Sequence, residues 1–211
     1  MKDHDLKQAS AREDLCRYLA ACYYQPAQEF ADEKLFDSML AAASCVHPDL
    51  AVHARRLGEE FAVEGVETLL IDYTRLFLGP THTLARPYGS VWLEGENVVM
   101  GESTMATLAL YREGGFDIGE EFREPPDHIA AELEFLYLLL YRENEAQREG
   151  KQGVLEAKAA LRHRFLDEHL GRWIGPFTAA VKAGAQTSFY RHLAELTHRF
   201  VGMQLVKAQG T

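Results

Sequence analysis

The sequence predicts an all-α fold, a helical bundle of about 8–10 helices in two halves that a proline-containing hinge joins. Apolar residues recur every three or four positions along most of the 211 residues, which is typical of amphipathic helices. Strand-like patterns are confined to one short stretch between residues 90 and 100. Hydrophobic residues make up 47% of the chain and charged residues 26%, so the chain can bury a core and is not largely disordered.

Charge and composition exclude several classes of protein. The 22 basic and 32 acidic side chains leave a net charge of −10, which excludes a nucleic-acid binder driven by bulk charge. No apolar run reaches the roughly 18 residues of a membrane-spanning helix, and the charged N-terminal residues do not resemble an export signal, so we expect a cytoplasmic protein. Cys16, Cys22 and Cys45 lack the paired spacing of zinc or redox sites and are expected to be small buried thiols.

Four helices are predicted before residue 80. The first begins at a capping box formed by Ser10 and Glu13 and ends before Pro26. Apolar stripes of helical spacing mark three more, over residues 35–43, 50–61 and 67–78. The fourth ends at Gly79 and Pro80, because glycine supplies a left-handed cap and proline cannot continue a helix.

Residues 80–101 interrupt this pattern. The segment contains two prolines and three glycines and has no helical stripe, so we predict a long irregular loop of the kind that often binds ligands. Within it, residues 90–93 and 97–100 flank a polar turn and are compatible with a short hairpin.

The helical pattern then resumes, and the chain divides into two parts. A helix around Met105 ends at Gly114 and Gly115, and residues 116–127 are expected to form the hinge. The helix from His128 is apolar nearly all round, which predicts burial. We expect parts 1–115 and 128–211 to pack as one compact unit, with later helices over residues 151–170, 173–183 and 187–206.

Candidate metal ligands and catalytic residues do not form a recognisable centre. A di-iron bundle needs two Glu-x-x-His pairs, and only Glu195 with His198 has that spacing. His128 and Glu132 could share a metal ion across one helical turn, but such pairs more often face solvent. We expect no metal. Since nucleophile elbows and phosphate-binding loops are also absent from the sequence, we expect no enzymatic activity.

Two clusters remain as candidates for binding. In the hinge cluster, Glu124 to His128, two prolines fix φ, Asp127 is suited to cap the following helix, and His128 is expected to carry a neutral ring at the helix N-terminus. In the loop cluster, Arg86 to Trp92, either Trp92 packs beneath the loop, or Tyr88 and Trp92 form an apolar groove. Beside carboxylates such as those of Glu94 and Glu96, the groove would suit a basic, partly apolar peptide.

Three stretches of the chain, taken together, resemble a known family. They are DYTRLFLGP at residues 72–80, PYGSVWL at residues 87–93 and EPPDH at residues 124–128. In this order and at these separations they are similar to the TorD/DmsD family of redox enzyme maturation chaperones. The helical pattern on both sides is compatible with that family over nearly the whole chain.

The resemblance implies a chaperone that binds the twin-arginine signal peptide of a molybdopterin oxidoreductase catalytic subunit and holds it from export until the cofactor is inserted. The family's peptide site maps to Tyr88, Ser90, Trp92, Pro125, Asp127 and His128, with Asp72, Tyr73, Leu76, Phe77 and Glu124 as a supporting motif. Two departures bear on which client is recognised: position 72 is often glutamate in relatives, and position 88 is tryptophan in some members.

Two other functions stay open at this point. One is a GTP-regulated protein that binds nucleotide weakly at the hinge, although no glycine-rich phosphate loop precedes a helix. The other is an unrecognised helical-bundle metalloenzyme. For the oligomeric state we expect a monomer, with a domain-swapped dimer as the alternative, because a proline-bearing hinge permits exchange of helical halves.

Overall fold

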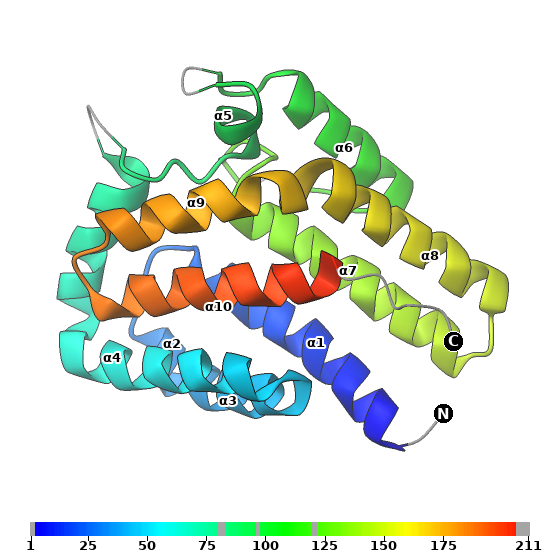
Figure 1. Cartoon of the computed structure of the whole chain (residues 1–211), viewed down its shortest axis with the longest axis horizontal. Coiled ribbons are helices and arrows are strands. Elements are labelled where there is room, and N and C mark those ends of the chain that lie inside the picture. Colours follow the sequence, from blue (N-terminus) through cyan, green and yellow to red (C-terminus); the bar gives the residue numbers. More distant parts are fainter. Residues whose placement is uncertain (1–2, 80–82, 96–97, 120–121, 206–211) are drawn as a thin grey trace.

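The computed structural model describes residues 3–79, 83–95, 98–119 and 122–205, and the regular secondary structure of these residues is helical (Figure 1). The helices in chain order are α1 Asp3–Cys22, α2 Glu29–Asp32, α3 Leu35–Val46, α4 Pro48–Tyr73, η1 Thr74–Leu78, α5 Gly89–Leu93, α6 Glu102–Gly114, α7 Ile129–Arg148, α8 Gln152–Phe165, η2 Leu166–Leu170, α9 Gly171–Gly184 and α10 Ser188–Leu205; η1 and η2 are single-turn π-helical segments. No β-strand occurs in the described ranges, and the predicted all-α fold is confirmed.

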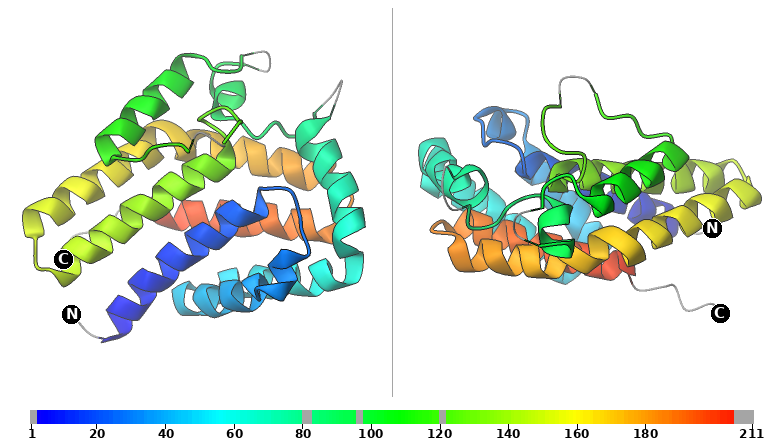
Figure 2. Two further views of the ribbon diagram at one scale, coloured as in Figure 1. Left: turned by 180° about the vertical axis from the view of Figure 1, so that it is seen from behind. Right: turned by 90° about the horizontal axis from the view of Figure 1, so that it is seen from above.

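The two sequence halves interleave in space. Helix α1 packs on α7 and α3, while α10 packs on α4 and α9, so α10 runs through the middle of the molecule with α9 beside it (Figure 1). One hydrophobic cluster joins Leu15 and Leu57 to Phe135, Phe177 and Phe200. Helices α5 and α6 lie at one end of the bundle, and the segment between α6 and α7 meets the start of α5 at its own end (Figure 2).

The first helix begins earlier than the sequence predicted. Helix α1 starts at Asp3 and runs continuously to Cys22. The prediction that a capping box at Ser10 and Glu13 begins this helix was therefore wrong. Glu13 lies inside the helix and accepts a hydrogen bond from Asn144 Nδ2 of α7 at 3.0 Å. The acidic side chain therefore joins two helices instead of capping one.

Helices predicted separately over residues 50–61 and 67–78 form one element with a kink. Pro48 is its first residue, and Gly65 interrupts the helical backbone with φ 74° and ψ 156°. Glycine adopts this positive φ without the steric penalty of a Cβ atom. After the kink the helix passes into η1, where Leu76 and Phe77 are buried.

The segment between residues 80 and 101 contains a helix where the sequence was compatible with a hairpin. Residues Gly89–Leu93 form α5, so the hairpin was wrong and the loop is less irregular than predicted. Glu96, named beside the expected groove, lies outside the described residues.

A second correction concerns the thiols: Cys16 and Cys22 are buried, but Cys45 is exposed near the end of α3.

Candidate functional site

The aromatic loop and the hinge meet through backbone hydrogen bonds. Gly89 N donates to the carbonyl of Asp127 at 2.9 Å, and Ile129 N donates to the carbonyl of Pro87 at 2.8 Å. Tyr88 and His128 form an isolated antiparallel bridge between these two bonds. The structure therefore brings together two clusters that are nearly forty residues apart in the sequence.

Asp127 caps a different helix from the one predicted. Its Oδ2 atom accepts the backbone N–H of Ser90 at 2.7 Å, which lies in the first turn of α5. Helix α7 is capped instead by His128, whose Nδ1 accepts the N–H of Ala130 at 3.1 Å. A tight turn precedes α7, in which His128 N donates to the carbonyl of Pro125 at 3.0 Å. From this turn the Asp127 side chain lies against α5.

His128 lies in an aromatic enclosure. Its ring stacks on Tyr24 at 6.5 Å between centroids and meets Tyr88 and Phe122 edge to face at 5.7 and 6.0 Å. Burial lowers the pKa of His128 to about 4, against a smaller opposing effect of the Asp127 carboxylate. The imidazole is therefore neutral at pH 7, as a cap that accepts an N–H must be.

The other predicted loop residues differ in exposure. Tyr88 is half-buried, and its hydroxyl donates to Glu124 Oε2 at 2.7 Å. Trp92 is also half-buried: its Nε1 donates to the carbonyl of Arg86 at 2.8 Å, and its ring packs on Phe177 of α9 at 6.2 Å. One side of Trp92 thus belongs to the core and part of the ring remains accessible.

The supporting motif of residues 72–77 lies mainly in the core. Tyr73, Leu76 and Phe77 are core residues. The Asp72 carboxylate is buried and accepts Arg75 Nη1 at 2.6 Å, Gln186 N at 2.9 Å, and the N–H and hydroxyl of Thr187 at 2.8 and 2.7 Å. Burial alone would raise its pKa, but these hydrogen bonds outweigh burial and lower it. Asp72 therefore ties the end of α4 to the turn before α10.

A buried polar cluster beneath α5 was missed from the sequence. Glu132 Oε1 lies 2.7 Å from His169 Nε2, and Trp173 Nε1 donates to Glu132 Oε2 at 3.1 Å. Thr107 Oγ1 lies 2.8 Å from the same His169 nitrogen. A Cβ atom at Gly89 would come within 2.9 Å of that nitrogen, so the glycine permits α5 to rest directly on the cluster.

Burial and the short contact act on the pKa values of the two ionisable groups in this cluster. Burial raises the pKa of Glu132, while the nearby carboxylate raises the pKa of His169 although burial opposes it. The 2.7 Å contact between Glu132 Oε1 and His169 Nε2 requires one proton between the two atoms. The sequence carried one signal of this pair, because a glutamate in a helix that is apolar nearly all round needs a buried partner.

Two polar atoms beside the cluster have no hydrogen-bond partner among the described residues. They are Ser90 Oγ and Asp127 Oδ1, and both residues are fully buried. An unsatisfied buried oxygen costs free energy. The contact between α5 and the hinge is therefore less stable than an interface in which every buried oxygen has a partner.

The surface around α5 combines a cavity with exposed apolar side chains. A cavity of about 700 Å³ is lined by residues of α5, α6, α8, η2 and α9, with His169 in its wall. Glu94 at its edge accepts the N–H groups of Glu102 and Ser103 and so caps α6. The large apolar residues exposed in and beside this loop region are Leu78, Leu84, Val99, Met100 and Met105.

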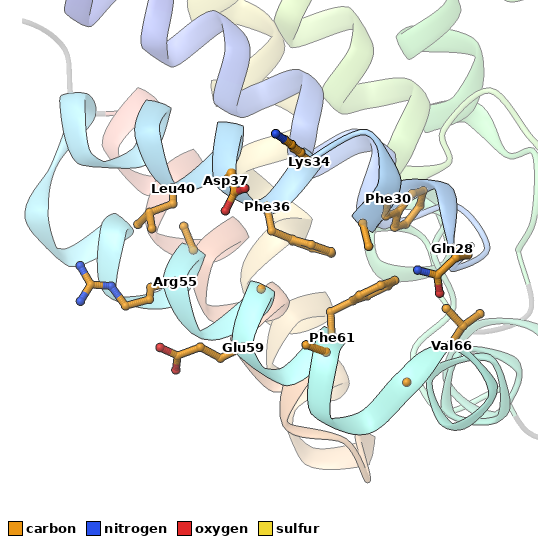
Figure 3. A pocket seen from close by; sticks show the side chains of 15 residues that line it. Gln28, Phe30, Lys34, Phe36, Asp37, Leu40, Arg55, Glu59, Phe61 and Val66 are labelled. Atoms are coloured by element: carbon orange, nitrogen blue, oxygen red, sulfur yellow. The ribbon is translucent and has the colours of Figure 1, made fainter.

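A second cavity lies away from this region, between α2, α3 and α4. It measures about 580 Å³ and has Phe30, Phe36 and Phe61 in its wall. Figure 3 shows these rings pointing toward one another from α2, α3 and α4, with charged side chains such as Lys34 and Arg55 farther out. None of the predicted site residues lines this cavity.

The groups named for the nucleotide and metalloenzyme alternatives have other partners in the structure. The first amides of α7 are occupied, since Ile129 N donates to Pro87 and Ala130 N to His128. The predicted pair of His128 and Glu132 is separated, because Glu132 contacts His169 instead. Glu195 accepts hydrogen bonds from Lys182 and Arg199. In the described ranges no group of three or more metal-ligating side chains could hold an ion.

Comparison with known proteins places the chain in a family. The nitrate reductase delta subunit model matches residues 41–179. The chaperone protein TorD of Shewanella pealeana is 29% identical over 140 residues, covering 63% of this chain and 57% of its own length. The Tat proofreading chaperone DmsD of Salmonella typhimurium is 32% identical over 136 residues, covering 64% of this chain and 66% of its own length.

A solved structure shares the fold. A crystal structure of a proposed redox enzyme maturation protein from Archaeoglobus fulgidus superposes with a TM-score of 0.56 at 23% identity, over 90% of this chain and 93% of that chain. The chain spans 57% and 66% of the length of the two curated relatives above. The family model alone covers more than half of the chain, and its matched region contains all three motif stretches. The chain therefore belongs to the TorD/DmsD family of redox enzyme maturation chaperones, which the nitrate reductase delta subunit model matches.

Proposed function

We propose that this protein is a chaperone without enzymatic activity that binds the twin-arginine signal peptide of a molybdopterin oxidoreductase catalytic subunit. It holds the peptide in the cytoplasm until the cofactor has been inserted. The observation that carries this proposal is the junction of loop and hinge, where Asp127 accepts the Ser90 amide at 2.7 Å. In support, the DmsD relatives carry the name of Tat proofreading chaperones. No described helix is long and apolar enough to cross a membrane.

The surface chemistry of this region suits such a peptide. A twin-arginine signal peptide presents two guanidinium groups followed by an apolar stretch. Met100 and Met105 are more than half exposed, and methionine side chains adapt to apolar partners of different shape. Exposed Glu124 supplies a carboxylate beside Tyr88, and the net charge of −10 attracts a basic peptide from a distance.

Burial divides the six predicted residues into two roles. Ser90, Asp127 and His128 are buried and would act by positioning α5 against the hinge. Tyr88, Trp92 and Pro125 are half-buried and would contact the peptide directly. Aromatic residues with an accessible face dominate the energetics of many peptide interfaces.

Isothermal titration calorimetry tests the proposal. The protein is titrated with a twin-arginine signal peptide and with the same peptide carrying glutamine at both arginine positions. We expect the glutamine peptide to bind at least about tenfold more weakly, and binding of the arginine peptide to weaken as salt rises. Equal affinity for both peptides would contradict a charge-dependent site.

A matched pair of variants locates the site. Met105→Ala removes an exposed apolar side chain beside the loop, and Val154→Ala removes one of similar exposure on α8. We expect only Met105→Ala to weaken peptide binding, about five- to tenfold.

Light scattering during gel filtration of the same samples tests the expected monomer against the domain-swapped dimer.

A further inference from the structure

Two histidines outside the loop and hinge face each other across a helix interface. His53 lies on α4 and His192 on α10, and their Nδ1 atoms are 3.1 Å apart. The ring centroids are 5.4 Å apart, and the ring planes meet at 42°. Both side chains are half-buried, so each pairs with the other while remaining open to water.

The separation of the two nitrogens matches that of two ligands on one transition-metal ion. Zinc binds imidazole nitrogen at about 2.0–2.1 Å, and two such bonds at an angle between square-planar and tetrahedral place the nitrogens about 2.9–3.4 Å apart. The observed 3.1 Å lies inside this range. A single N–H···N hydrogen bond between neutral rings fits the same distance, so the surroundings must distinguish the two.

The electrostatic surroundings favour a cation. The charged groups that act on one or both rings are Asp49, Glu60, Glu64, Glu195, Arg56 and Arg199. Lys182 and Arg199 pair with Glu195, and Arg199 also lies near Asp49. Four carboxylates therefore face three basic groups, which leaves an excess of one negative charge around the pair. In the neutral tautomer protonated at Nε2, each ring presents the lone pair of its Nδ1 atom, so two neutral rings lose no net proton when they bind a metal.

We propose that His53 and His192 bind one divalent transition-metal ion of the zinc, nickel or copper class through their two Nδ1 atoms. Water fills the remaining positions, because the described residues offer no third ligand at this place. Imidazole nitrogen is a ligand that all three ions accept. The bound ion joins α4 to α10, which Glu64 already links by accepting the N–H groups of Ser188 and Phe189.

The test uses the full chain in a Cys45→Ser background, since the exposed thiol of Cys45 is a competing ligand. Calorimetric titration with Zn²⁺ and with Ni²⁺ at pH 7.5 is combined with thermal melts followed by circular dichroism. We expect a rise in Tm of about 3–6 °C at a free-metal concentration of about ten times Kd. His53→Gln and His192→Gln should each weaken binding about tenfold or more, because each removes one of two nitrogen ligands.

Two control variants address other histidines. His198→Gln changes a second histidine of α10, and His47→Gln removes the exposed imidazole beside Asp49. Neither should alter metal affinity. The proposal is overturned if the double variant His53→Gln/His192→Gln keeps the metal-dependent rise in Tm, or if the parent protein binds neither ion up to about 1 mM. Melts without metal establish that each variant is folded.

Discussion

The carboxylate of Asp127 accepts the backbone N–H of Ser90 at 2.7 Å, across 37 positions of the sequence. The acid next to the hinge prolines therefore fixes the first turn of α5, and α5 lies over the buried pair of Glu132 and His169. Loop, hinge and buried pair form one unit. Changes to any of the three should alter the same surface.

Asp127→Ala should destabilise the protein by about 1–3 kcal/mol, because it leaves the buried N–H of Ser90 without an acceptor. It should also weaken binding of the twin-arginine peptide. Urea denaturation and peptide calorimetry measure the two effects. Asp117→Asn changes an exposed acid in the same segment and serves as the control. If the two variants behave alike, Asp127 does not hold α5 in place.

Asp72→Ala should lower stability by about 3 kcal/mol while leaving peptide affinity unchanged at temperatures well below Tm. The substitution removes an acceptor of four hydrogen bonds at the turn before α10 and leaves Arg75 without its carboxylate. Because the pKa of Asp72 is lowered in the folded protein, its contribution is present near neutral pH and is lost as pH falls through that pKa. A large loss of peptide affinity at low temperature would place Asp72 in the binding site.

His128 should make stability depend on pH between about 6.5 and 4. Its pKa falls from 6.5 to about 4 on burial, so the unfolded chain binds more protons in this window and stability declines as pH is lowered, by up to about 3 kcal/mol. His128→Asn keeps a side chain that caps a helix but does not titrate. Urea midpoints at several pH values should converge for the two proteins as pH falls, whereas parallel curves would contradict this assignment.

Gly89→Ala should destabilise the protein by about 1–3 kcal/mol through overpacking. The added Cβ would lie 2.9 Å from His169 Nε2, 3.0 Å from Trp173 Nε1 and 3.1 Å from Glu132 Oε1. Gly175→Ala in α9 meets nothing within 4 Å and should be neutral or slightly stabilising, because alanine favours helix. Comparison of the two thermal melts tests this, and equal Tm values would show that α5 tolerates displacement.

The sequence by itself determined where most of the helices lie and several of their ends. Stripes of apolar residues located the helices, and Gly115 ended α6 with φ 66° as its position predicted, because periodicity and glycine conformation act within one or two turns. The same local character explains the errors. The capping box at Ser10 and the hairpin near Trp92 were compatible with the local sequence pattern. In the folded protein both positions lie inside helices.

Tertiary structure alone decided the partners of the buried polar groups. Asp127 was expected to cap α7 and instead contacts Ser90, while Glu132 meets His169 from 37 residues away and His53 meets His192 from 139 residues away. A buried carboxylate or imidazole must be satisfied, but which donor satisfies it depends on which helices pack together. That choice is made by the whole core, and local sequence carries only the signal that a partner is needed.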